Sequence, residues 1–71
     1  MGQTEAIYNK LPANVREMIE EYRAAYKQVR HEYNTEHYEI IGAMSGYAKG
    51  LRDAGLITEK ERKVIRCYMT V

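Results

Sequence analysis

Apolar and aromatic side chains recur three or four residues apart from Val15 to Leu51. This spacing is that of one face of an α-helix. Good helix formers such as Glu, Ala, Arg, Lys and Gln fill most positions between them in residues 16–28. We therefore expect one long amphipathic helix from Ala13 to about Ala54. Its apolar stripe consists of Val15, Met18, Tyr22, Tyr26, Val29, Tyr33, His37, Ile40, Met44, Tyr47 and Leu51.

Two stretches could interrupt this helix. Asn34 and Thr35 are poor helix formers, and Thr35 is suited to cap the start of a new helix. Each of Gly42, Gly46 and Gly50 weakens a helix interior by ~1 kcal/mol relative to alanine. The alternative to the continuous helix is therefore a bundle that is broken near Asn34 or Gly42.

Short helices are expected on both sides of the long one. Residues 4–11 favour a first helix that Thr4 caps and Pro12 ends, because proline disfavours the helical conformation of the residue before it. Proline also suits a first helical turn, so Pro12 is equally suited to open the next helix.

The last helix has the clearest boundary in the sequence. Gly55 is suited to the left-handed position that ends many helices. Thr58 and Glu61 have the spacing of a capping box and predict a helix from Glu59 to Met69. The sequence thus predicts a single all-α domain over residues 1–71: a short N-terminal helix, a long central helix and a C-terminal helical hairpin.

The length of the central helix suggests a binding function. A continuous helix over residues 13–54 would be ~60 Å long, whereas a compact domain of this size is ~30 Å across. Another chain would then have to cover its middle. We therefore expect a non-catalytic protein that binds a protein partner or a second copy of itself.

The aromatic residues point to the same role. All seven are tyrosines, with no Phe and no Trp, and tyrosine suits surfaces that are apolar on one side and wet on the other. The alternative is that these rings pack on the terminal helices with their hydroxyls at the edge. The predicted partner-binding residues are Tyr22, Tyr26, Val29 and Tyr33, flanked by Arg23, Lys27 and Arg30.

Three glycines four residues apart form a smooth strip on the long helix. Gly42, Gly46 and Gly50 would let another backbone approach closely. We expect the chain's own last helix to pack against them. A bend at this point and close approach by a partner are the alternatives.

A basic cluster on the last helix gives the sequence a second candidate surface. Glu59 and Glu61 stand at the start of this helix, where they would repel phosphates, so binding of nucleic acid is disfavoured but stays an alternative. The candidate phosphate contacts are Lys60, Arg62, Lys63 and Arg66.

Catalytic and metal-binding signals are weak. Ser45 is the only serine and Asp53 the only aspartate, and their spacing does not suggest a catalytic triad. His31 and His37 are six residues apart and point to different sides of a helix. We expect no enzyme activity, no metal, no cofactor and no small-molecule substrate. On the apolar stripe, His37 is expected to be a packed residue.

Charge, cysteine content and the lack of long apolar runs indicate the compartment in which the protein is expected. The net charge of the 71 residues is +1, and Cys67 is the only cysteine, so no internal disulfide can form. We expect Cys67 to be a small half-buried residue in a reducing compartment. The sequence has no apolar run long enough for a membrane span and no signal-peptide pattern, so a cytoplasmic protein without membrane contact is expected.

One segment resembles a known module. Residues 51–61, Leu-Arg-Asp-Ala-Gly-Leu-Ile-Thr-Glu-Lys-Glu, look like the helical-hairpin turn of small bacterial domains, including the C-terminal modules called SHOCT. The size and charge mix are also similar to those of accessory proteins of phages and mobile elements. Some of those proteins inhibit host nucleoproteins such as CRISPR nucleases, which makes an inhibitor of this kind an alternative function.

Overall fold

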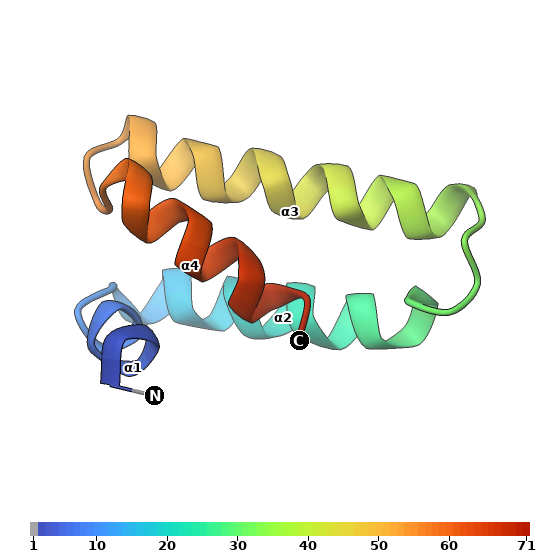
Figure 1. The fold of residues 1–71 in the computed structure, drawn as a ribbon, viewed down its shortest axis with the longest axis horizontal. Helices are drawn as coiled ribbons and strands as arrows, with labels where there is room; N and C mark the ends of the chain where they lie inside the picture. Colours follow the sequence, from blue (N-terminus) through green and yellow to red (C-terminus); the bar gives the residue numbers. More distant parts are fainter. Residues whose placement is uncertain (1) are drawn as a thin grey trace.

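The computed structural model describes residues 2–71 and is all-α over that range, as predicted. Helix α1 spans Gly2–Asn9, α2 spans Ala13–Val29, α3 spans Thr35–Asp53 and α4 spans Glu59–Met69. Helices α2 and α3 form an antiparallel hairpin, α4 folds back over one half of it, and α1 lies at the same end as the start of α4 (Figure 1). Over this range we find no helix that could cross a bilayer.

The single central helix predicted from the sequence is wrong, and the break lies near Asn34. Tyr33 adopts a left-handed conformation with φ of 51°, and Asn34 is extended. The Asn34 Oδ1 atom accepts a hydrogen bond from the backbone N–H of His37 at 3.0 Å, so Asn34 caps α3 in place of Thr35. The chain therefore reverses, and its longest dimension is 33 Å.

The start of the chain also differs from the prediction. Helix α1 begins at Gly2 and ends at Asn9, so Thr4 lies inside it. Pro12 precedes α2, and its carbonyl accepts hydrogen bonds from the backbone N–H groups of Val15 and Arg16. Proline is suited to this place because its fixed φ fits a helix entry.

The predicted boundary of the last helix is confirmed. Gly55 has a φ of 80°, the left-handed conformation that a glycine adopts without strain. Thr58 Oγ1 accepts from the Glu61 N–H at 3.1 Å, and the Thr58 N–H donates to Glu61 Oε1 at 2.9 Å. These two bonds are the expected capping box.

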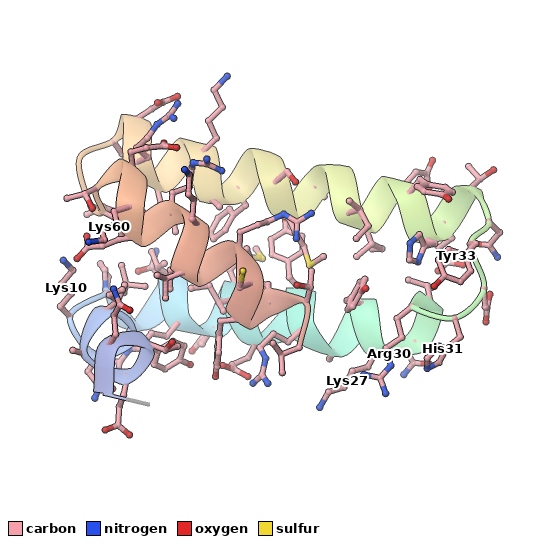
Figure 2. All side chains as sticks on the ribbon, in the orientation of Figure 1. Lys10, Lys27, Arg30, His31, Tyr33 and Lys60 are labelled. Atoms are coloured by element: carbon pink, nitrogen blue, oxygen red, sulfur yellow. The ribbon has the colours of Figure 1, made fainter. Side chains whose placement is uncertain are left out.

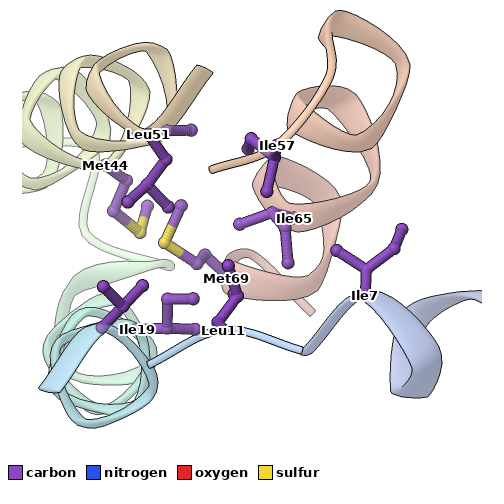
Figure 3. Packing of buried hydrophobic residues seen from close by; sticks show 10 residues of the cluster. Ile7, Leu11, Ile19, Met44, Leu51, Ile57, Ile65 and Met69 are labelled. Atoms are coloured by element: carbon purple, nitrogen blue, oxygen red, sulfur yellow. The ribbon is translucent and has the colours of Figure 1, made fainter. Parts of the chain in front are cut away.

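The hydrophobic core draws on all four helices and the loops around them (Figure 3). The two halves of the apolar stripe face each other across the α2–α3 hairpin, and α4 covers them. The chain thus shelters most of its own stripe, contrary to the expectation that another chain must do so. The buried cluster consists of Ile7, Leu11, Val15, Ile19, Met44, Ala48, Leu51, Ile57, Ile65 and Met69.

Helix α4 is too short to cover the whole hairpin. It has 11 residues, against 17 in α2 and 19 in α3. The Arg66 Nε atom donates to Ser45 Oγ at 2.8 Å, which places the last turn of α4 beside the middle of α3. The hairpin end, residues 27–41, therefore has no third helix on this face (Figure 1).

Candidate interaction surface

Three tyrosine rings surround a buried histidine at the hairpin end. The ring of His37 is 4.9 Å from that of Tyr38, 5.0 Å from Tyr33 and 5.9 Å from Tyr26, measured between centroids. The residue is 5% exposed, and its Nδ1 atom lies 2.9 Å from the Val29 carbonyl oxygen. The expectation of a packed histidine is confirmed. The tyrosines close the core where α4 does not reach.

Two of these rings are largely open to solvent. Tyr33 is 67% exposed and Tyr38 is 61% exposed. A tyrosine ring with this exposure presents apolar surface to water and carries a hydroxyl at its edge. Such rings are typical of protein interfaces.

Two exposed cations, Lys27 and Arg30, lie at the end of α2. The exposed His31 follows them, and Figure 2 shows all three at the same end of the hairpin as Tyr33. Within residues 2–71, neither Lys27 nor Arg30 forms an ion pair. The Arg30 Nε atom instead donates to His31 Nε2 at 3.2 Å. Their charges are therefore available to a partner.

The helical period places these cations on the same side of α2 that α4 covers nearer the start of the helix. Arg23, Lys27 and Arg30 follow one another at four and three residues, so they share one side of α2. Arg23 contacts Tyr68 of α4, which fixes that side as the α4 face.

The same argument applies to α3. Ser45 contacts Arg66 of α4, and Ile41 and Tyr38 precede Ser45 by four and seven residues on the same side. The α4 face of the hairpin thus continues beyond α4 as an uncovered surface, which we call the distal shelf. It consists of Tyr26, Lys27, Arg30, Tyr38 and Ile41.

Acidic residues occupy the other edges of the hairpin. Glu21 on α2 and Glu36 and Glu39 on α3 are exposed. Glu21 and Glu36 lie a third of a turn or more from the stripes that carry the shelf, and Glu39 lies about 100° from Tyr38. The acidic groups of the two helices therefore lie beside the shelf and not on it.

Arg23 holds α2 to α4 and is not free for a partner. Its Nη1 atom donates to Glu20 Oε1 at 3.1 Å and to the Tyr68 hydroxyl at 3.0 Å, and the Tyr68 hydroxyl donates to Glu20 Oε2 at 3.0 Å. Burial alone would raise the pKa of Glu20, but hydrogen bonds from Tyr8, Tyr68 and Arg23 outweigh it and lower that pKa. Burial and the Glu20 carboxylate raise the pKa of Tyr68.

The predicted partner-binding set therefore divides into two groups. Val29 is buried, Arg23 is tied to α4, and the half-buried Tyr22 ring packs on Tyr47 at 5.4 Å, so these three serve the fold. The exposed cations Lys27 and Arg30, the exposed Tyr33 and the half-buried Tyr26 remain as candidates.

The sequence interpretation missed three residues at this surface. Tyr38 and His31 lie off the apolar stripe, and Ile41 lies beside it. Only the position of the hairpin turn brings them next to Tyr26 and Arg30. The signal in the sequence was Tyr38 itself, a large aromatic residue outside the apolar stripe, where a polar residue is expected.

A second surface feature is an open groove between α1 and α4. Its volume is about 880 Å³, and apolar atoms dominate its lining. The Tyr8 and Tyr68 rings pack on each other at 5.6 Å, and Cys67 is exposed, not half-buried as expected. The lining residues are Gln3, Thr4, Glu5, Tyr8, Asn9, Arg23, Lys63, Val64, Cys67, Tyr68 and Val71.

The predicted role of the three glycines in packing is wrong. Gly42, Gly46 and Gly50 are exposed, and a Cβ atom added to any of them would have no atom within 4 Å beyond its own helix. Helix α4 packs on the Ser45 side of α3 instead, and α3 runs through the glycines without a break.

The basic cluster of α4 is largely occupied by contacts within the protein. Arg62 forms an ion pair with Glu59, and Arg66 bonds Ser45, which leaves Lys60 and Lys63 as the exposed cations of the predicted phosphate-binding set. Glu59 also pairs with Arg52. The hydrogen bonds from Arg62 and then Arg52 hold the pKa of Glu59 at about 2.

Neither a metal site nor a relative was found. Among the residues described, no three His, Cys, Asp or Glu side chains are grouped to hold a metal ion. No protein family, no curated protein and no solved structure matches the chain significantly.

Proposed function

We propose that this chain is a non-catalytic interaction protein that binds another protein through the distal shelf and the adjoining Tyr33. The observation that carries this proposal is the exposed aromatic and basic surface at the hairpin end. Tyr38 is 61% exposed there, and Lys27 and Arg30 form no ion pair within residues 2–71.

The residue types support a binding role. A tyrosine side chain has few rotatable bonds, so it loses little entropy on binding while it buries a large area. Tyrosine and arginine are enriched among the residues that contribute most to protein interfaces. Unpaired cations at the rim favour a partner with complementary charge and speed its association.

The local charge favours a protein over a nucleic acid. Residues 27–39 carry two basic and three acidic side chains. Glu32 accepts a hydrogen bond from Asn34 Nδ2 at 3.0 Å and so stays in the turn next to the shelf. Two cations are too few for a nucleic-acid site, which needs a longer row of them because phosphate contacts supply most of its affinity.

The charge pattern also favours a different protein over a second copy. A two-fold axis through the shelf would place Lys27 and Arg30 opposite the same residues of the other copy. Like charges in an interface disfavour association.

Variant pull-downs from the native host test this proposal. Tyr33→Asn removes an exposed ring at a left-handed position that asparagine tolerates, and Lys27→Glu with Arg30→Glu reverses the basic row. We expect each change to lower recovery of a co-purifying protein by at least about tenfold, whereas Lys60→Glu on α4 leaves recovery unchanged. Equal recovery with all variants would contradict the proposal.

A further inference from the structure

We infer that the occupant of this surface is an acidic amphipathic helix, and that its apolar side enters the α1–α4 groove. This inference rests on the proposed function and specifies the chemistry of the partner. It starts from Arg23, which lines the groove and also begins the stripe of Lys27 and Arg30. The first cation of the shelf, Lys27, therefore lies about one helical turn beyond the groove, on the same side of α2.

The two parts of this surface differ in character. The groove is lined mainly by apolar atoms, with Val64, Cys67 and the Tyr8–Tyr68 pair among its walls. The shelf carries the exposed cations Lys27 and Arg30. A segment that fills both must present apolar side chains over the groove and carboxylates over the shelf.

The spacing of the cations fits a helical partner. Lys27 and Arg30 are three residues apart on one side of α2, and Arg23 and Arg30 are separated by ~10 Å along the helix axis. A partner helix that lies along α2 would meet Lys27 and Arg30 with carboxylates three or four residues apart. The same partner helix would bring apolar residues at i and i+4 toward the groove, the usual pattern of a helix that binds in a groove.

The groove also argues against phosphate ligands. The cation of Arg23 is already paired with Glu20. Lys63 is the other cation of the lining. An anionic polymer without apolar groups would make no apolar contact with Val64 and Tyr68, so burial of these side chains would not favour its binding.

A synthetic peptide tests the inference directly. The probe is a fluorescein-labelled helical peptide of about 18 residues with Leu on one face and Glu on the face next to it, and its matched control has Lys in place of Glu. We expect the acidic peptide to bind by fluorescence anisotropy, with an affinity that falls as salt is raised. Lys27→Glu with Arg30→Glu should weaken it at least about tenfold, and Lys60→Glu should not.

The single cysteine reports on the groove. Cys67 is exposed and lines the groove, so its rate of reaction with a thiol reagent measures access to it. We expect saturating acidic peptide to slow this reaction several-fold, and Val64→Glu to weaken peptide binding. A peptide that binds through Lys27 and Arg30 without slowing Cys67 would overturn the inference and leave the proposed function standing.

Other outcomes are equally decisive. Failure of the acidic peptide to bind, equal binding of the Lys peptide, or tighter binding of an oligothymidylate than of the acidic peptide would each overturn the inference. In the first two cases, loss of the co-purifying protein in the shelf variants would still support the proposed function.

Discussion

The guanidinium carbon of Arg23 lies 4.1 Å from the centroid of the Tyr68 ring, and Arg23 Nη1 donates to the hydroxyl of the same residue at 3.0 Å. The Tyr68 hydroxyl in turn donates to Glu20. This contact joins the middle of α2 to the last turn of α4. It fixes how the last turn of α4 lies on α2, and the distal shelf begins beyond this contact.

Removal of the Tyr68 hydroxyl should destabilise the protein. Tyr68→Phe keeps the ring but removes one half-buried hydrogen bond from each of Glu20 and Arg23, so we expect the free energy of unfolding to fall by about 1–2 kcal/mol. Urea denaturation measures the change. Tyr38→Phe is the control, because no hydrogen bond of the Tyr38 hydroxyl is seen, and its effect should stay within about 0.5 kcal/mol. Equal effects of both changes would contradict the role given to this contact.

Alanine at the exposed glycines of α3 should stabilise the protein. A Cβ atom at Gly42, Gly46 or Gly50 meets no neighbour within 4 Å, so only the helix propensity changes. We expect a gain of about 0.5–1 kcal/mol for each substitution. Thermal or urea denaturation of the three single variants checks this.

Gly55 provides the matched control for the α3 glycines. Its Cβ would also meet no atom, but its φ is 80°. Gly55→Ala should therefore lower the free energy of unfolding by about 1 kcal/mol. A loss of stability at Gly42, Gly46 or Gly50 would show that a helix or partner packs there after all.

The cap of α3 gives a prediction that separates two neighbouring residues. Asn34→Ala removes the hydrogen bond from Asn34 Oδ1 to the His37 N–H and should cost about 1 kcal/mol. Thr35→Ala should change stability by less than about 0.5 kcal/mol, since Thr35 lies in the helix and not at its cap. The reverse order in urea denaturation would place the helix start at Thr35.

Local sequence rules predicted the boundary at Gly55 and Thr58 correctly, but the caps expected at Thr4 and Thr35 and the single long helix are wrong. The glycine at position 55 and the capping box at Thr58 are set by residues within one turn, so spacing alone was sufficient. The same local pattern is compatible with a continuous helix and with a hairpin of two helices that breaks at Asn34. Reversal wins because it buries Val29 against His37 and the Met44 side of α3 against α2 and α4, which no short-range rule contains.

The candidate surface was predicted only in part for the same reason. Lys27, Arg30 and Tyr33 were selected from their pattern on the predicted central helix. Tyr38 was missed because its exposure beside Tyr33 follows from the position of the turn. Val29 and Tyr22 were assigned to a partner because a continuous helix would have left them bare.

The ion pairs of Glu59 predict a pH dependence. Arg62 and Arg52 hold its pKa at about 2, below the ordinary value of 4.5. The stabilisation by the charged form is therefore complete above about pH 4.5 and is lost as the pH falls toward 2.

Comparison with a neutral side chain tests this dependence. We expect Glu59→Gln to be less stable than the wild type near neutral pH, with a difference that shrinks as the pH is lowered from about 5 to about 2. Glu39→Gln, at an exposed residue for which no ion pair is seen, is the control. A difference at Glu59 that stays constant over this range would contradict the assignment.

Photo-crosslinking in the native host tests the central claim most directly. A photoreactive phenylalanine derivative replaces Tyr33 in one strain and Lys60, on the exposed side of α4, in another. The account predicts a discrete protein adduct after illumination with the probe at position 33, at least about tenfold stronger than with the probe at position 60. An adduct that forms only at position 60, or equally at both, would contradict a partner-binding surface at the end of the α2–α3 hairpin.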